Sequence, residues 1–174
     1  MTVTLVEETG AGVANSNSYI SRADADTYWG AQYYSSIWDA LTNSGKDILL
    51  VMATRLLDEW VEWIGRKASS SQALRWPRYG TEDRDGYWFD SDVIPTFLKN
   101  ATAELAGYLA KSDATSEPDT KGFSSMKIGD LALTIDKSDR DNTTTIPDSV
   151  LVMLEPHGNI RRRGGDGTAK LLRT

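Results

Sequence analysis

The stretch from Trp63 to Ala106 reads WIGRKASSSQALRWPRYGTEDRDGYWFDSDVIPTFLKNATAELA, and it decides how we expect the chain to fold. The stretch includes a long connection, Lys67 to Asp92, that is rich in serine, glycine and charged residues. Aromatic residues, prolines and acids recur along the stretch. So much aromatic surface predicts a packed loop rather than a mobile one. The packed aromatic loop is expected to contain Trp76, Pro77, Arg78, Tyr79 and Trp88.

Apolar residues at helical spacing lie on both sides of this stretch. Helices are predicted at about 21–34, 46–66, 93–111 and 147–155. Ser21 resembles the first residue of a capping box, because an acid follows three positions later. Pro95 and Pro147 suit the first turn of a helix, where a missing amide has no partner to lose.

A β-hairpin is predicted at about 124–136, where Gly129-Asp130 supplies a turn pair and apolar residues then alternate with polar ones. The expected fold class is mainly α: a small helical bundle with an inserted β-hairpin and an extended C-terminal arm. Residues 1–158 would form one domain, and residues 159–174 the extended basic arm.

The charge of the chain is distributed unevenly. The net charge is −6, but the part from His157 onward carries +4, so the remainder carries −10. An acidic body repels a phosphate backbone, which weighs against DNA binding by the body. The first residues, MTVTLVEETG, lack the features of a secretory signal, and the longest apolar run, Ile48 to Ala53, is too short for a membrane span. We therefore expect a soluble, cytoplasmic protein without a membrane partner.

Catalytic and metal-binding patterns are weak. The single histidine, His157, lies beside a proline and a glycine, so we expect an exposed structural residue rather than part of a triad. Residues 81–92 partly match a calcium-loop template, but Thr81 and Asp92 are wrong at its first and last positions. The chain has no cysteine and no glycine-rich phosphate loop. No catalytic residue, metal or cofactor is predicted, and we do not expect an enzyme.

One short segment, Arg75 to Tyr79, resembles a patch on which DNA bases could stack. An arginine folded over a Trp or Tyr ring within the loop explains the same residues, and the other tryptophans have mostly acidic neighbours. We favour the internal packing role.

The C-terminal arm is a segment that a self-contained domain would not need. It combines an arginine triplet, glycines and a terminal Leu-Leu pair, which favours ordering on a partner protein's acidic groove. A solubilising tail or an RGG-like nucleic-acid contact are the alternatives. The residues expected to make the contact are Ile160, Arg161, Arg162, Arg163, Lys170, Leu171, Leu172 and Arg173.

Several ordered sub-motifs carry a resemblance to a known family. They are Gln72-Ala73-Leu74, Trp76-Pro77-Arg78, Asp83 to Gly86, Ile94-Pro95 and Ala103-Glu104-Leu105-Ala106. The chain resembles tailed-bacteriophage head-to-tail adaptor proteins, also called head-completion or connector proteins. That family often carries the label "DnaT-like single-stranded DNA-binding", and the two descriptions imply different functions.

The adaptor resemblance implies a structural virion protein that forms a twelve-fold ring, joins the portal to the next tail or connector protein, and lines the DNA channel. The expected partners are the portal protein, the downstream connector, other copies of the chain, and genomic DNA that passes without specific binding. The arm would dock on the portal, and the expected subunit contacts are Lys127, Ile128, Gly129, Asp130 and Leu131. The protein would reside in the virion, after assembly in the host bacterial cytoplasm. The alternative is a single-stranded DNA-binding replication module, which needs a basic aromatic groove.

Overall fold

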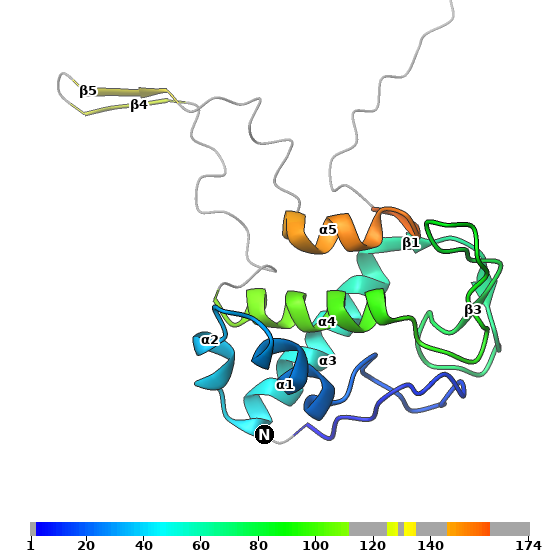
Figure 1. The fold of residues 1–174 in the computed structure, drawn as a ribbon. Helices are drawn as coiled ribbons and strands as arrows, with labels where there is room; N and C mark the ends of the chain where they lie inside the picture. The colour runs from blue at the N-terminus through cyan, green and yellow to red at the C-terminus, as the bar shows by residue number, and fades with distance from the viewer. Residues whose placement is uncertain (1–2, 112–124, 129–130, 135–145, 161–174) are drawn as a thin grey trace, which may run out of the picture. The chain divides into compact units, whose positions relative to one another are not determined.

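The computed structural model describes residues 3–111, 125–128, 131–134 and 146–160 (Figure 1). The chain divides into two compact units, and each is described by itself. The first unit comprises residues 1–114 and 146–161, and the second comprises residues 115–145 and 162–174. The arm beyond Ile160 therefore lies outside the described residues. Within these ranges no helix is long and apolar enough to cross a membrane.

The first unit contains the helices α1 (Arg22–Gly30), α2 (Ser36–Asp39), α3 (Asn43–Trp60), α4 (Thr96–Leu109) and α5 (Asp148–Leu154). Ser21 caps α1, because its hydroxyl oxygen accepts a hydrogen bond from the Asp24 amide at 3.1 Å. Thr42 caps α3 in the same way through the Gly45 amide. Pro95 and Pro147 are the N-cap residues of α4 and α5, so each stands one position before the helix it introduces.

Helix α4 is the centre of the first unit and packs against α1, α3 and α5 (Figure 1). Many of the buried residues of α4 have small side chains, which lets neighbouring elements approach closely. The Trp29 ring of α1 lies so near Gly107 that an added Cβ would come within 2.1 Å of it. The Trp29 indole N–H also donates to the Ala103 carbonyl at 3.1 Å. Substitution of Gly107 by alanine would therefore displace the tryptophan that joins α1 to α4.

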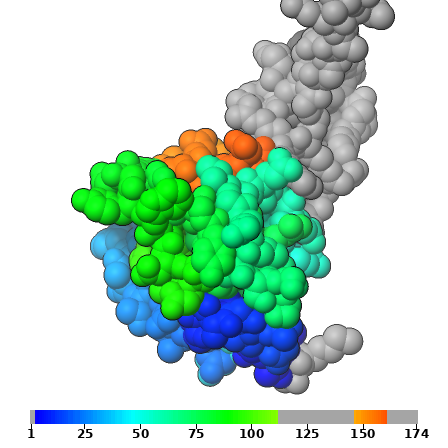
Figure 2. Space-filling view, turned by 90° about the vertical axis from the view of Figure 1, so that its right-hand side faces the viewer, coloured from blue at the N-terminus to red at the C-terminus, as the bar shows by residue number. Residues whose placement is uncertain are grey.

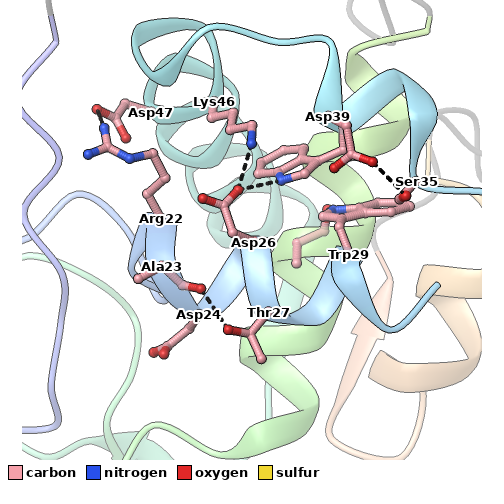
Figure 3. A network of polar contacts seen from close by, with 12 residues as sticks. Arg22, Ala23, Asp24, Asp26, Thr27, Trp29, Ser35, Asp39, Lys46 and Asp47 are labelled. Atoms are coloured by element: carbon pink, nitrogen blue, oxygen red, sulfur yellow. Dashed lines mark hydrogen bonds and ion pairs between the residues drawn. The ribbon is translucent and has the colours of Figure 1, made fainter.

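A polar network ties the first three helices together (Figure 3). The Asp26 carboxylate accepts hydrogen bonds from Lys46 Nζ at 2.7 Å and from the Trp38 indole at 2.8 Å. Burial raises the pKa of Asp26, but these two donors outweigh burial and hold it below its usual value. The carboxylate is therefore the shared acceptor of α2 and α3.

Short antiparallel strand pairs accompany the helices. Strand β1 (Val61–Trp63) pairs with β6 (Gly158–Ile160), β2 (Arg66–Lys67) with β3 (Arg78–Tyr79), and β4 (Ser125–Ile128) with β5 (Leu131–Thr134). The pair β4–β5 belongs to the second unit and falls within the range predicted for a hairpin. Gly129 and Asp130, its predicted turn, lie outside the described residues.

The predicted fold class, a mainly α bundle, is wrong: the described residues form a mixed α/β structure. The helix predicted to continue to about residue 66 ends at Trp60, because Val61 adopts an extended conformation, with φ −103° and ψ 125°. Its backbone pairs with Ile160, a residue assigned to the extended arm. β-Branched and aromatic residues favour strands, and a long-range partner decides between strand and helix here.

Candidate nucleic-acid interface

The predicted aromatic loop has a buried half that is built around Trp76. This residue is 0% exposed and makes edge contacts with the rings of Trp63, Phe89 and Phe97, at centroid distances of 5.8, 6.1 and 5.7 Å. The His157 imidazole stacks on Phe97 with the centroids 3.8 Å apart. These rings form the base on which the rest of the loop rests.

Arg78 belongs to the same buried half. Its guanidinium donates to the carbonyl oxygens of Ile64, Arg75, Trp63 and Gly65 at distances between 2.6 and 3.3 Å. Burial lowers the pKa of Arg78 from its usual value. The guanidinium is therefore committed to the backbone, and Arg78 cannot serve as a contact for a phosphate.

The segment Arg75 to Tyr79, predicted either as a stacking patch or as internal packing, is divided by the structure. Trp76, Pro77 and Arg78 are buried, whereas Arg75 and Tyr79 are exposed. Trp88, the remaining member of the predicted packed loop, is also exposed. The patch therefore does not exist as a continuous surface, and the exposed rings lie elsewhere on the loop.

The exposed half of the loop consists of Tyr79, Tyr87 and Trp88, which we call the aromatic surface. These residues are 47%, 73% and 66% exposed. The loop between β3 and α4 stands out from the molecule in Figure 2, beside residues that precede it in the sequence. Backbone bonds from Phe89 to Thr81 and from Asp83 to Tyr87 fold residues 81–89 back on themselves.

The tip of the loop is a turn held by the Asp83 carboxylate. The Asp83 carboxylate accepts hydrogen bonds from the amides of Asp85 and Tyr87 at 2.9 and 2.8 Å. Gly86 has a φ of +85°, which a residue with a Cβ rarely adopts. In the described part of the chain, no group of at least three His, Cys, Asp or Glu residues could hold a metal ion. The acids that partly matched the calcium template thus form a turn.

Two arginines flank the aromatic surface. The Arg66 guanidinium lies 5.7 Å from the centroid of the Tyr79 ring, as its position opposite Tyr79 in the β2–β3 pair requires. Arg84 donates to the Val152 carbonyl at 3.0 Å. Among the described residues, neither arginine has a carboxylate within ion-pair distance. Both cations are therefore able to contact a phosphate at the edge of the surface.

A hollow of about 300 Å³ lies below Trp88. Its lining residues are Ile64, Gly80, Thr81, Glu82, Asp83, Trp88, Pro156 and His157. The expectation that His157 is exposed is wrong, because it is only 5% exposed. The β1–β6 pairing, extended by a bond from the Ile64 amide to the His157 carbonyl, draws this residue into the aromatic cluster. Burial lowers the pKa of His157 below its usual value.

A larger groove of about 610 Å³ runs beside the C-terminal half of α3. The Asp58 carboxylate lies in it, accepts a hydrogen bond from the Tyr19 hydroxyl, and accepts another from the Arg75 amide at 3.0 Å. Burial raises the pKa of Asp58 above its usual value. The groove is lined by the acids Asp58, Glu59 and Glu62 and by the arginines Arg55, Arg75 and Arg78, so its formal charges cancel and it offers a phosphate backbone no net attraction. Sequence reasoning missed the contact between Tyr19 and Asp58, because 39 positions separate the two residues and no local pattern joins them.

The remaining residues singled out from the sequence lie in strands β4, β5 and β6 or outside the described ranges. Ile160 ends β6 and lies opposite Val61. Lys127 lies in β4, and Ile128 pairs with Leu131 across the β4–β5 strands. The arm residues from Arg161 onward lie outside the described residues.

Comparison with known protein families matches residues 3–174 to a family described as "Putative DnaT-like ssDNA binding protein". The match covers nearly the whole chain, so the chain belongs to this family. No curated protein and no solved structure matches it.

This match overturns the predicted identity. The family is described by single-stranded DNA binding, and nothing in it supports a bacteriophage head-to-tail adaptor. The recognition as an adaptor is therefore wrong, as are the associated features: a portal-binding virion connector, a twelve-fold ring, and DNA that passes without being bound. The physical reason for the error is that the resemblance depended on residues that build the fold. Trp76, Pro77 and Arg78 are buried scaffold residues, and scaffold residues report a fold without specifying a partner.

Proposed function

We propose that this protein is a non-catalytic module that binds single-stranded DNA through its aromatic surface. The observation that carries the proposal is the exposure of Tyr79, Tyr87 and Trp88 on one loop that is anchored to a buried aromatic cluster. The description of the family supports the same partner.

The physical basis is stacking. Each base of a single strand has a free π face, and stacking on an aromatic side chain contributes about 1–3 kcal/mol per base. A loop that keeps its rings in place in the absence of DNA loses little conformational freedom on binding. The Asp83 turn and the contact between Trp76 and Phe89 supply that rigidity.

The acids of the loop affect which part of the DNA strand the protein would contact. Glu82, Asp85 and Asp90 are exposed near the rings, and they repel phosphates. Only Arg66 and Arg84 among the described residues are placed to offset this repulsion beside the surface. Binding would therefore rest on the bases more than on the backbone, which favours a single strand, because a duplex hides the faces of its bases.

The test is fluorescence anisotropy with a 5′-labelled single strand of about 12 nucleotides, within the range of site sizes known for such modules. Substitution Trp88→Ala should weaken binding about fivefold to 100-fold, the equivalent of one lost stacking contact. A double substitution Tyr33→Ala and Tyr34→Ala is the matched control, because these rings are 92% and 78% exposed but lie between α1 and α2, away from the β3–α4 loop (Figure 1). The control should bind like the unaltered protein.

Two results would overturn the proposal. One is the absence of single-strand binding at physiological salt by the full-length protein. The other is an equal loss of affinity in the Trp88→Ala variant and in the Tyr33/Tyr34 control. That result would mean that exposed aromatic rings contribute to DNA binding wherever they lie on the protein.

A further inference from the structure

Two residues that line the hollow beside Trp88 carry buried polar atoms that have no hydrogen-bond partner within the described residues. Thr81 is 1% exposed and His157 is 5% exposed, and both line the hollow. Neither the Thr81 hydroxyl oxygen nor His157 Nδ1 makes a hydrogen bond within the described structure. Buried polar groups are nearly always satisfied, and each one left unsatisfied costs about 1–3 kcal/mol. Two such atoms around one hollow therefore point to a polar ligand.

The hydrogen-bonding capacity of the two groups is defined by their surroundings. The neutral imidazole of His157 carries one proton, so Nδ1 accepts a hydrogen bond in one tautomer and donates one in the other. The Thr81 hydroxyl can donate or accept. Together they suit a group that presents an N–H donor next to an acceptor, and the Watson–Crick edge of every DNA base, which is free in a single strand, offers that combination.

The walls of the hollow suit a planar, largely apolar group. Trp88, Ile64 and Pro156 contribute ring and hydrocarbon surface. The volume of about 300 Å³ is at the lower end of the range for small-ligand pockets, about 300–1,000 Å³. That size favours a single ring system over a complete cofactor.

We infer that the hollow receives one unstacked nucleobase of the bound strand, with Thr81 and His157 as the hydrogen-bonding groups and Trp88 as the stacking wall. The inference rests on the proposed function and deepens it. The aromatic surface would bind a strand of any sequence, whereas the hollow would add a preference for a particular base at one position of the strand. Thr81 and His157 would then determine specificity.

The direct test uses the fact that the chain has a single histidine, so an imidazole ¹⁵N signal belongs to His157 without further assignment. Full-length ¹⁵N-labelled protein is titrated with an oligonucleotide of about eight nucleotides and with an abasic strand of the same length. The Nδ1 resonance should move with the normal strand and stay in place with the abasic one, because only a base presents a donor and acceptor edge to it.

A pair of variants supplies the second arm. Thr81→Val keeps the shape of the side chain, removes its hydroxyl, and should weaken binding of the preferred sequence about threefold to tenfold, the effect of one hydrogen bond. Binding of the least preferred sequence should change less. Thr27→Val is the matched control, because Thr27 lies exposed on α1 and donates only to the Ala23 carbonyl. It should bind like the unaltered protein.

The outcomes separate the two proposals. If no oligonucleotide binds, the proposed function fails and this inference fails with it. If Trp88→Ala weakens binding but the His157 signal stays in place and Thr81→Val binds normally, bases stack only on the outer surface. That result overturns the inference and leaves the proposed function standing.

Discussion

The two halves of the aromatic loop come from one continuous sequence and have opposite environments. Trp76 is fully buried against Trp63, Phe89 and Phe97, whereas Trp88, twelve positions later in the printed sequence, is two-thirds exposed. The difference teaches that aromatic content alone does not distinguish a core from a binding surface. Buried rings determine whether the loop exists, and exposed rings determine what it can contact.

The strongest test of this division is the effect of Trp76→Ala on stability. Removal of a fully buried tryptophan should lower the free energy of unfolding by about 3–5 kcal/mol. The matched change Trp88→Ala should alter it by about 0.5 kcal/mol or less, since the ring is exposed. Urea denaturation followed by circular dichroism measures both values. Similar losses in the two variants would contradict the division.

A second test addresses the buried arginine. Arg78→Lys should lower the free energy of unfolding by about 1–3 kcal/mol, because one ammonium group cannot satisfy the carbonyls that the planar guanidinium reaches. Arg66→Lys, a change on the exposed side, should leave stability nearly unchanged. The same denaturation experiment compares them. Equal stability of the Arg78→Lys variant and the unaltered protein would show that the backbone contacts contribute little.

The pH dependence of stability tests the role of His157 in the buried half. Its pKa is lower in the folded protein than its usual value of 6.5, so the unfolded chain binds a proton more readily. The stabilisation is therefore fully present above pH 6.5 and is lost as the pH falls through the folded pKa. His157→Phe, which retains an aromatic ring beside Phe97, should flatten the fall in stability below pH 6.5. An unchanged pH profile in this variant would assign the dependence to other groups.

The smallest expected effect is on the salt dependence of DNA binding, which tests the role of the arginines beside the exposed half of the loop. If only Arg66 and Arg84 contact phosphates, the logarithm of the binding constant should fall with the logarithm of salt concentration with a slope of about −1.4 for a single strand. Arg66→Ala should reduce the slope by about 0.7. Anisotropy titrations at several salt concentrations measure it. A much steeper slope would show that cations beyond these two take part.

The positions of α1, α3, α4 and α5 were largely predictable, because their signals are local, whereas the short helix α2 was not predicted. Ser21 caps α1, and prolines introduce α4 and α5, as the sequence indicated. The end of α3 was not predictable in this way. Trp60 is followed by Val61, whose strand partner Ile160 is remote in the sequence, so no periodicity could reveal the pairing.

The candidate site shows the same limit. The sequence revealed an aromatic loop, but burial and exposure within it depend on which rings meet Phe97 and His157. His157 was expected to be exposed because a proline and a glycine surround it. Its burial follows from the pairing of β6 with β1, which is again a long-range contact.

The position of His157 also has a consequence for the order in which the protein becomes competent during synthesis. Pro156 and His157 contribute one part of the lining of the hollow, and the rest comes from residues 64–88. Because Pro156 and His157 are remote in sequence from the other lining residues, the hollow is complete only once β6 has paired with β1. We therefore expect a nascent chain to lack the proposed base-binding hollow until the residues up to Ile160 have left the ribosome.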